Sequence, residues 1–303
     1  MARSKARAAV LSITSNSLLI TIKAAAGFLT GSISILAEAI HSLLDLVAAV
    51  IAFFGVMVAD RPSDVEHPFG HGKAENVSGV IESILIFIAA AIIIYEAISK
   101  LAEGAALEMT ELGIAVMGVS VVVNILVSRR LLKVARQTDS VALEADARHL
   151  TTDVWTSAGV LVGLLVVRLT GLNALDPIIA LGVAVFIIRA AYGILVKSYS
   201  GLIDTRLPAE EEAIIRQCLA EHSQRLVGFH GLRTRKAGSQ RFIELHLVMP
   251  KEASVADAHR VCDHLEKDLR KRFAGSRITI HVEPCADECP ECQVTCEVKT
   301  KKD

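Results

Sequence analysis

Long apolar segments separated by short polar ones fill the chain up to about Ser200. The hydrocarbon core of a bilayer takes about 20 residues of helix, and six of these segments reach that length. They lie at about 8–30, 33–58, 76–98, 111–133, 145–169 and 176–198. The pattern therefore predicts six transmembrane helices.

The pattern changes at Leu207 to that of a small soluble domain. Three glutamates after Pro208 open an amphipathic helix, because Pro and acidic residues favour the first turn. Further along, Phe242, Glu244 and His246 alternate with apolar neighbours, which is the two-residue period of a strand. The expected elements are that helix, strands at 227–235 and 241–248, a helix at 254–272 and a last strand at 277–283. This α-β-β-α-β order favours an open, ferredoxin-like sheet with helices on one face.

Together these elements predict an α-helical membrane protein with six transmembrane helices and a small α+β cytoplasmic domain. The expected domains are a membrane unit at 1–206, a cytoplasmic unit at 207–285 and a cysteine-containing tail at 286–303. A module of about 80 residues has only a small core, so pairing with a second copy would stabilise it.

Composition and charge agree with this division. With 303 residues, 52% of them hydrophobic, and a mean hydropathy of +0.47, the chain is too apolar for a typical soluble protein. Lysine and arginine concentrate before the first segment and in the second and fourth loops. By the positive-inside rule, both termini and those two loops are cytoplasmic. We expect a multi-pass membrane protein, with no cleavable signal peptide ahead of the first segment.

The second and fifth apolar segments carry the same polar pair at the same spacing. Residues four apart lie on one face of a helix, so each pair offers an imidazole nitrogen and a carboxylate oxygen to one point. The four side chains, here called the intramembrane quartet, are His41, Asp45, His149 and Asp153. Four such groups suit a tetrahedral divalent ion, and ionisable groups at this depth usually face a cavity, a partner or an ion path. The alternative is that they hydrogen-bond neighbouring helices to each other without binding metal.

Three further polar residues lie within the predicted spans. Glu38 comes about one turn before His41 and is either a carboxylate on the access path or an interfacial residue. Glu82 and Asn124 are expected to pack between helices rather than to bind metal. We therefore leave all three out of the candidate ion site.

The loop between the second and third segments contains a second group of candidate ligands. Asp64, His67 and His71, here called the loop cluster, offer three zinc-compatible donors within eight residues. Neighbouring proline and glycine residues would hold the loop in a turn. Glu66 could replace one of the three ligands. An ordinary solvated polar loop is the alternative.

Candidate ligands are also scattered through the soluble domain. They are His230, His246, His259, His281 and Glu283. His246 and His281, for example, lie on predicted strands, where an outward-facing imidazole is often only a surface residue. Because dispersed histidines have no spacing signature, the pattern alone leaves both a metal site and a plain surface open.

The C-terminal tail is rich in cysteine. Its four thiols are Cys285, Cys289, Cys292 and Cys296. So dense a group suits a soft ion such as Zn²⁺, but the spacing is not the paired C-x-x-C of a zinc ribbon. A flexible metal-capturing or redox-active tail is the alternative to a fixed site.

The sequence lacks the features of several other protein classes. No Walker A pattern is present, which argues against an ATP-driven pump and leaves an ion gradient or the substrate's own gradient as the energy source. Nothing indicates binding of nucleotide or nucleic acid, and no enzymatic activity is expected. A membrane metallohydrolase would need a general base and a substrate cleft, for which only Glu38 is a loose candidate.

The motifs as a set resemble the cation diffusion facilitator family. The resemblance covers about residues 8–285 and is nearest to the bacterial zinc and iron efflux branch. It rests on six spans, the two His/Asp pairs, the loop sequence His-x-x-x-His-Gly-Lys-Ala-Glu and the appended α-β-β-α-β domain. It implies a homodimer in a bacterial inner membrane that exports a cytoplasmic divalent cation in exchange for protons by alternating access.

The same resemblance implies roles for the candidate residues. The intramembrane quartet corresponds to the family's transport site, and the loop cluster to its loop site. The five soluble-domain residues fall where the family binds a pair of metal ions at the dimer interface. Lys73 and Asp204 look like a charged pair that links the membrane and cytoplasmic parts across the dimer. Some relatives have Asp in place of His41 or Glu283, and the cysteine tail lies beyond the match.

The predicted function is a Zn²⁺/H⁺ antiporter, with Zn²⁺ both transported and regulatory. Histidine nitrogens favour Zn²⁺ over the oxygen-preferring Mn²⁺ and Mg²⁺. Histidine must be neutral to bind metal, so the quartet takes up protons as it releases the ion. The alternatives are an exporter of Fe²⁺, Cd²⁺, Co²⁺, Ni²⁺ or Mn²⁺, and a membrane metal sensor that does not transport, for which no output domain is recognisable.

Overall fold

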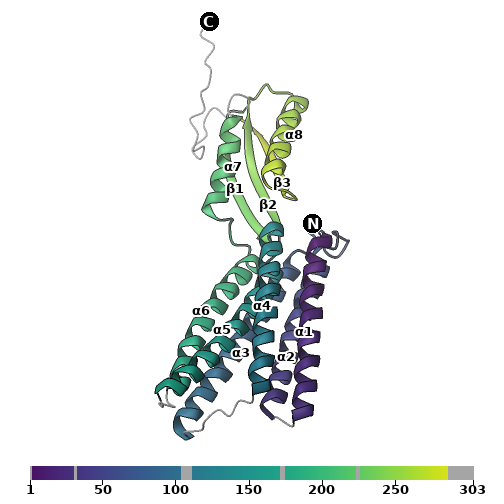
Figure 1. Ribbon diagram of the computed structural model, residues 1–303. Helices are drawn as coiled ribbons and strands as arrows, with labels where there is room; N and C mark the ends of the chain where they lie inside the picture. Colours follow the sequence, from purple (N-terminus) through teal and green to yellow (C-terminus); the bar gives the residue numbers. More distant parts are fainter. Residues whose placement is uncertain (1, 31–32, 104–110, 171–174, 223–225, 286–303) are drawn as a thin grey trace. The chain divides into compact units, whose positions relative to one another are not determined.

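The computed structural model describes residues 2–30, 33–103, 111–170, 175–222 and 226–285. Within the helices some side chains, those of Glu38 and His41 among them, lie outside the described set. The chain divides into two compact units, Met1–Leu202 and Ile203–Asp303. The first unit is helical, and the second combines a sheet with helices (Figure 1).

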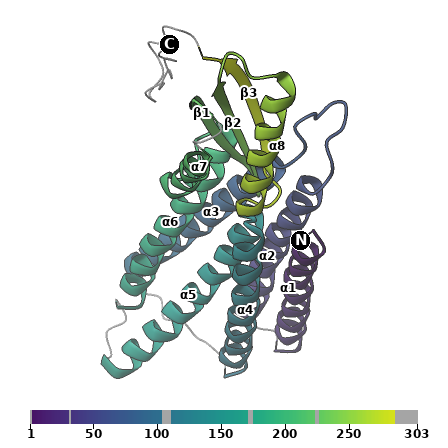
Figure 2. The ribbon, with the colours of Figure 1, turned by 90° about the horizontal axis from the view of Figure 1, so that it is seen from above.

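Six helices make up the described part of the first unit. They are α1 (Ala2–Thr30), α2 (Ile33–Ala59), α3 (Lys73–Glu103), α4 (Glu111–Thr138), α5 (Val141–Thr170) and α6 (Leu175–Leu202). Helix α3 packs along α6, and α1 packs along α2 (Figure 2). Helix α4 packs along α5. Each apolar segment predicted from the sequence lies within one of these helices.

Four of the six helices are long and apolar enough to cross a membrane, judged on the described residues. Their apolar stretches, in α1, α3, α4 and α6, are Arg3–Leu29, Lys73–Ser99, Ala115–Thr138 and Pro177–Leu202. In α2 the described apolar run is shorter, Asp45–Ala59, and α5 carries Asp146, His149 and Asp153 in its first half. The expectation of apolar spans is confirmed for four helices and stays a prediction for α2 and α5.

Small residues let α3 and α6 approach each other closely. A Cβ atom on Gly79 would lie 2.3 Å from Oγ of Ser198, and one on Gly201 would lie 2.1 Å from Nδ2 of Asn76. The same Nδ2 of Asn76 donates a hydrogen bond of 3.2 Å to the carbonyl oxygen of Ser198. Close backbone approach and interhelical hydrogen bonds are the means by which helices pack where lipid supplies no hydrophobic driving force.

Packing and charge together fix the first half of α5 against α1, α2 and α4. The buried apolar residues there are Ala8, Ala9, Val56, Val127, Leu131, Val134, Ala135, Ala142, Leu143, Ala147 and Leu150. At the start of α5, the fully buried Glu75 accepts hydrogen bonds from Nζ of Lys5 (2.7 Å) and from the backbone N–H of Val141 (2.9 Å). These contacts therefore also hold His149, about two turns further along α5, in place.

The second unit has the predicted α-β-β-α-β order. Its elements are α7 (Ala209–Glu221), β1 (Gly228–Ala237), β2 (Gln240–Met249), α8 (Val255–Arg272) and β3 (Arg277–Pro284). Strand β1 pairs antiparallel with β2, and β2 pairs parallel with β3, so the sheet order is β1-β2-β3. A parallel pair needs a crossover connection, which α8 supplies.

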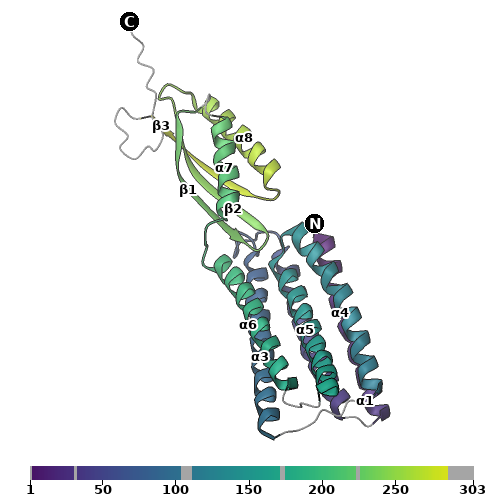
Figure 3. The same ribbon diagram turned by 60° about the vertical axis from the view of Figure 1, so that its left-hand side comes forward.

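Helices α7 and α8 lie beside the strands of the sheet (Figure 3). Both helices share one hydrophobic core with the sheet. The buried residues of α7, β2 and α8 in this core include Ile215, Cys218, Leu219, Ile243, Leu245, Leu247, Leu265 and Leu269. Side chains alternate along a strand, so Glu244 and His246 lie on the face of β2 away from the helices. The predicted alternation of β2 and the placement of both helices on one face of the sheet are confirmed.

Candidate metal centres

Three members of the intramembrane quartet converge between α2 and α5. One ligand atom each from Asp45, His149 and Asp153 lies within 4.8 Å of the others. Nε2 of His149 is 3.3 Å from Oδ1 of Asp45, and both residues are 6% exposed. The side chain of His41 lies outside the described residues, so its part in this cluster stays a prediction.

The spacing of these atoms suits a small divalent ion. Zinc bonds of about 2.0–2.1 Å place neighbouring ligand atoms of a tetrahedral site about 3.3 Å apart. Nδ1 of His149 is buried and has no hydrogen-bond partner among the described residues. Nδ2 of Asn16 on α1 donates to the carbonyl oxygen of Asp45 at 3.3 Å, which holds α2 in place at the cluster.

A buried carboxylate that the sequence reasoning did not single out lies one turn before His149 on α5. Asp146 is 1% exposed and accepts a hydrogen bond of 3.1 Å from Oγ of Ser12. Glu82 of α3 is also fully buried and accepts a hydrogen bond of 3.3 Å from Oγ of Ser78. The signal for Asp146 was its position three residues before His149, which places both side chains on neighbouring parts of one helix face.

The loop cluster also converges. Oδ1 of Asp64 accepts a hydrogen bond of 2.6 Å from the backbone N–H of His67 and lies 3.1 Å from Nδ1 of the same residue. Nε2 of His71 lies 3.3 Å from Oδ2 of Asp64. The hydrogen bond from the backbone of His67 lowers the pKa of the Asp64 carboxyl. Glu66 is not one of the described residues that converge here, so the loop presents three candidate ligands.

Strand register brings the dispersed histidines of the soluble domain together on the open face of the sheet. His230 of β1 pairs with His246 of β2, and His246 pairs with His281 of β3. Paired residues point to the same face, so the three imidazoles form a row with ring centroids 5.0 Å apart at each step. Glu283, two residues after His281 on the same strand, shares that face. We call these four residues the sheet cluster.

The carboxylate of Glu283 lies at the centre of the sheet cluster. It is 2.9 Å from Nε2 of His230, 2.7 Å from Nδ1 of His246 and 3.6 Å from Nε2 of His281. Hydrogen bonds from His246 and then from His230 lower the pKa of the Glu283 carboxyl. One ligand atom each from His230, His246 and Glu283 lies within 4.8 Å of the others. The group can therefore bind a divalent ion from solvent.

Several predicted ligands are not joined to these clusters in the described chain. His259 on α8 is not among the described groups that converge, and its exposed side chain has Nε2 3.9 Å from Oδ1 of Asp263. Cys285 is partly exposed. Cys289, Cys292 and Cys296 lie outside the described residues. A tail site and a role for His259 stay predictions.

Lys73 and Asp204 each have partners within their own unit. Nζ of Lys73 donates to the carbonyl oxygen of Leu202 at 3.0 Å. Asp204 lies 3.1 Å from Nη1 of Arg235. The charged pair that the family resemblance implies between Lys73 and Asp204 across a dimer stays a prediction.

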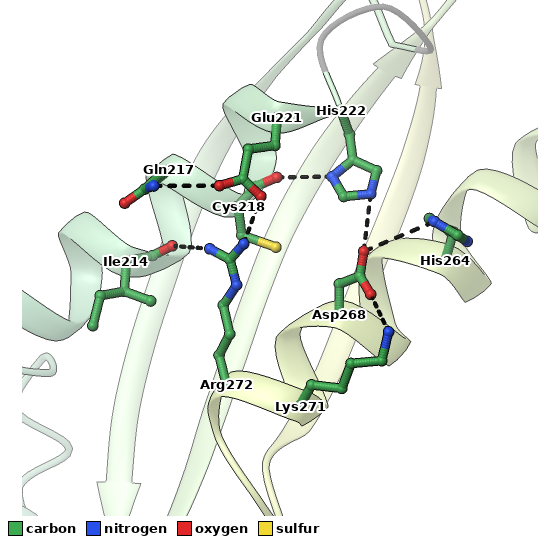
Figure 4. A network of polar contacts seen from close by, with 9 residues as sticks. All are labelled: Ile214, Gln217, Cys218, Glu221, His222, His264, Asp268, Lys271 and Arg272. Atoms are coloured by element: carbon green, nitrogen blue, oxygen red, sulfur yellow. Dashed lines mark hydrogen bonds and ion pairs between the residues drawn. The ribbon is translucent and has the colours of Figure 1, made fainter.

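One convergent group was missed by the sequence reasoning. His222, at the C-terminal end of α7, lies with His264 and Asp268 of α8, and ligand atoms of the three are within 4.8 Å of one another (Figure 4). We call these three residues the helix cluster. Its signal in the sequence is His264-x-x-x-Asp268, the spacing of the two membrane pairs, but His222 comes from another element.

Two family models match this chain. Residues 9–203 match a model described as the cation efflux transmembrane domain. Residues 207–285 match one described as the cation efflux protein, cytoplasmic domain. The two matches together cover most of the chain and meet close to the division between its two compact units.

Similar full-length proteins are known from several bacteria. An uncharacterized transporter of Synechocystis sp. is 39% identical over 279 residues, which are 92% of this chain and 90% of that protein. The cation-efflux pump FieF of Pectobacterium atrosepticum is 34% identical over 266 residues, 88% of each chain. FieF of Citrobacter koseri is 34% identical over 280 residues, 92% of this chain and 93% of that protein.

A solved structure is similar to a smaller part of the chain. It is the Zn form of CzrB, a candidate zinc transporter. Its sequence is 44% identical, and the match covers 28% of this chain and 96% of that one, with a TM-score of 0.27.

Proposed function

Because this chain belongs to the cation efflux family, we propose that it is a Zn²⁺/H⁺ antiporter that exports Zn²⁺ from the cytoplasm. The observation that carries this proposal is the buried convergence of Asp45, His149 and Asp153 from two different helices. All three lie within the part of the chain that matches the transmembrane domain. His41, one turn before Asp45, would be the fourth ligand.

The choice of zinc rests on the donor atoms. Imidazole nitrogen with carboxylate oxygen suits Zn²⁺, whereas Mn²⁺ and Mg²⁺ prefer oxygen alone. The FieF relatives are named as cation-efflux pumps without a stated metal. Fe²⁺, Cd²⁺, Co²⁺ and Ni²⁺ accept the same donors, so they are the competitors that a transport assay must include.

Coupling to protons follows from the burial of the cluster. Two carboxylates and one or two imidazoles share a site in which Asp45 and His149 are almost inaccessible to water. Uncompensated charge in such surroundings is costly, so a departing cation must be replaced. Protons are the replacement, because metal ligands are deprotonated when they bind and free to take up protons when they release.

The proposed architecture has six spans, with α2 and α5 crossing the membrane beside the four apolar helices. Basic residues in the loops support a bacterial inner-membrane protein with both termini in the cytoplasm. The proposed domains are 1–206 for transport, 207–285 for the cytoplasmic unit and 286–303 for the tail. The cytoplasmic unit would pair with a second copy, and the homodimer would work by alternating access.

The exposed clusters have a different proposed role. The loop cluster and the sheet cluster would bind regulatory Zn²⁺ from the cytoplasm, since water reaches both. In the homodimer His259 would join the sheet cluster, and Lys73 would pair with Asp204 across the subunits.

The test is zinc uptake in proteoliposomes that contain a zinc-sensitive dye and a lumenal pH dye. An antiporter gives both signals, with protons leaving the vesicle as zinc enters. The same vesicles are offered Fe²⁺, Cd²⁺, Co²⁺, Ni²⁺ and Mn²⁺ to rank the cargo. Vesicles without protein give the leak rate. Zinc binding without either signal would identify a sensor, and zinc uptake without proton movement would remove the antiport mechanism.

A further inference from the structure

The helix cluster lies where the C-terminal end of α7 meets α8, away from the open face of the sheet (Figure 4). Nε2 of His222 is 3.3 Å from Oδ2 of Asp268, and Nε2 of His264 is 3.8 Å from the same oxygen. The two imidazole rings have centroids 5.4 Å apart. Two imidazole nitrogens and one carboxylate oxygen therefore face a common point.

The other nitrogen of His222 determines what its Nε2 can do. Nδ1 lies 2.8 Å from the carbonyl oxygen of Cys218. A carbonyl oxygen only accepts hydrogen bonds, so Nδ1 carries the hydrogen and donates it. In the neutral ring Nε2 then presents a lone pair to the carboxylate of Asp268, and two such atoms repel each other. The contact needs a cation between them, either a proton on Nε2 or a metal ion.

The carboxylate of Asp268 is also oriented by its neighbours. Nζ of Lys271 donates to Oδ1 at 2.8 Å, which leaves Oδ2 directed at the histidines. The same hydrogen bond from Lys271 lowers the pKa of the Asp268 carboxyl. The next cation along α8, Arg272, is directed instead at Glu221 of α7, with 2.5 Å between Nη2 and Oε2. This ion pair joins the two helices beside the cluster.

The distances in the helix cluster leave room for a metal ion between the ligand atoms. Charge-assisted hydrogen bonds between nitrogen and a carboxylate are usually about 2.7–2.9 Å long. The contacts of Glu283 in the sheet cluster, at 2.7 and 2.9 Å, have that length. The contacts of Asp268 in the helix cluster, at 3.3 and 3.8 Å, are longer, and the contact with His222 matches the spacing of about 3.3 Å between ligand atoms around zinc.

We propose that His222, His264 and Asp268 form a separate site for a borderline divalent cation such as Zn²⁺. The ligand atoms are Nε2 of each histidine and Oδ2 of Asp268, and water is the fourth ligand. The bond from Nδ1 of His222 to the Cys218 carbonyl is the outer contact by which proteins orient metal-binding imidazoles. The side chains are 11%, 54% and 24% exposed, so an ion enters from solvent. The bound ion links the C-terminal end of α7 to α8.

The test counts zinc ions on the purified full-length protein in detergent. Chelator-treated protein is dialysed to equilibrium against zinc, and bound metal is measured by atomic absorption. His264→Gln removes one ligand at a mostly exposed position. Glu266→Gln is the matched control, because it removes a carboxylate on the same helix together with its 2.8 Å ion pair to Arg270 and leaves the helix cluster intact.

The proposal expects His264→Gln to bind one ion fewer per chain than the wild type, or to bind that ion at least tenfold more weakly, while Glu266→Gln binds as the wild type does. Thermal unfolding without metal should be the same for all three proteins, and only added zinc should separate them. Asp268→Asn provides a second variant if His264→Gln unfolds. Unchanged zinc content and affinity in both cluster variants would show that a proton, not a metal, bridges these residues. The measurement involves no gradient, so its failure leaves the transport proposal untouched.

Discussion

The intramembrane quartet and the sheet cluster use the same donor types in opposite surroundings. The side chains of His149 and Asp45 are 7% and 8% exposed, whereas those of His246 and His281 are 43% and 65% exposed. Charge without a partner is costly in the buried cluster, while water and salt screen it at the sheet. Under the proposed function, gain or loss of the ion would therefore be matched by protons in the first cluster but not in the second.

The two clusters also differ in their contacts. The carboxylate of Glu283 already accepts short hydrogen bonds from two histidines, so the sheet cluster is satisfied without metal. In the membrane unit, Nδ1 of His149 has no hydrogen-bond partner among the described residues. A site whose groups are hydrogen-bonded to one another without the ion is suited to regulation. A site that lacks such hydrogen bonds is suited to repeated exchange of metal for protons.

The largest expected effect is at the buried cluster. Asp45→Asn keeps the side-chain size but removes an anionic ligand, and zinc uptake into proteoliposomes should fall by more than about 100-fold, since loss of outer-shell partners alone costs 10–100-fold. The control is Glu96→Gln, which removes an exposed carboxylate of α3 outside the cluster. Uptake by Asp45→Asn equal to that of the control would place the transport site elsewhere.

Loss of a buried ion pair in the first unit should cost more stability than loss of an exposed ion pair in the second. The side chains of Lys5 and Glu75 are 3% and 0% exposed, so Lys5→Met leaves a buried charge and should cost about 3–5 kcal/mol of unfolding free energy. Arg270→Met breaks an exposed pair with Glu266 on α8 and should cost less than about 1 kcal/mol. Unfolding of both variants in detergent tests this contrast, and equal losses would contradict it.

Changes at the sheet cluster should be milder for transport. The double variant His246→Gln, His281→Gln removes two exposed imidazoles, and zinc uptake at saturating zinc should stay within about fivefold of the wild type, because no ligand of the buried cluster is lost. The change that should appear instead is loss of the regulatory response, so that binding of Zn²⁺ at the sheet cluster no longer increases the rate of uptake at low zinc concentration. Measuring rate against zinc concentration separates these effects. Complete loss of transport in the folded double variant would contradict the proposal that the buried cluster transports and the sheet cluster regulates.

The smallest expected effect concerns acid stability. His246 and His230 hold the pKa of Glu283 below its ordinary value of 4.5. A carboxyl with a lower pKa in the folded state contributes stability that is fully present above pH 4.5 and is lost as pH falls through the lower folded value. Glu283→Gln should therefore lower the Tm of the soluble unit at neutral pH, and the difference should vanish in strong acid.

The matched control for that measurement is Glu244→Gln, because Glu244 is an exposed carboxyl on β2, the strand next to β3. Its Tm should follow that of the wild type at every pH. If Glu283→Gln and Glu244→Gln behaved alike, the histidines would not stabilise the ionised form of Glu283.

How far each cluster could be predicted depends on how many elements supply it. The loop cluster comes from one short segment, so its spacing was visible in the sequence. The sheet cluster needs the register that pairs His230 with His246 and His246 with His281, and no local pattern contains that register. The helix cluster needs the packing of α7 on α8. Its His264-x-x-x-Asp268 pair does not by itself predict a site, because such pairs are common on solvated helices.

The order of the helices and strands could be predicted from local sequence, but the burial of their polar groups could not. The length of the apolar segments was sufficient for the order of helices in the first unit, and periodicity was sufficient for the order of elements in the second. Apolarity alone could not locate the proposed ion site, because its described ligands come from two different helices, α2 and α5. Asp146 was overlooked for a related reason: its burial and its hydrogen bond from Ser12 depend on α1, which its own segment does not reveal.

The central claim is that zinc and protons exchange at the same buried side chains. The most direct measurement is zinc-driven proton flux in proteoliposomes that contain Asp153→Asn, recorded beside the wild type and Glu96→Gln with zinc and pH dyes in the same vesicles. We predict that Asp153→Asn shows neither zinc entry nor proton release, while Glu96→Gln shows both at the wild-type ratio. Undiminished proton flux in Asp153→Asn would contradict the account.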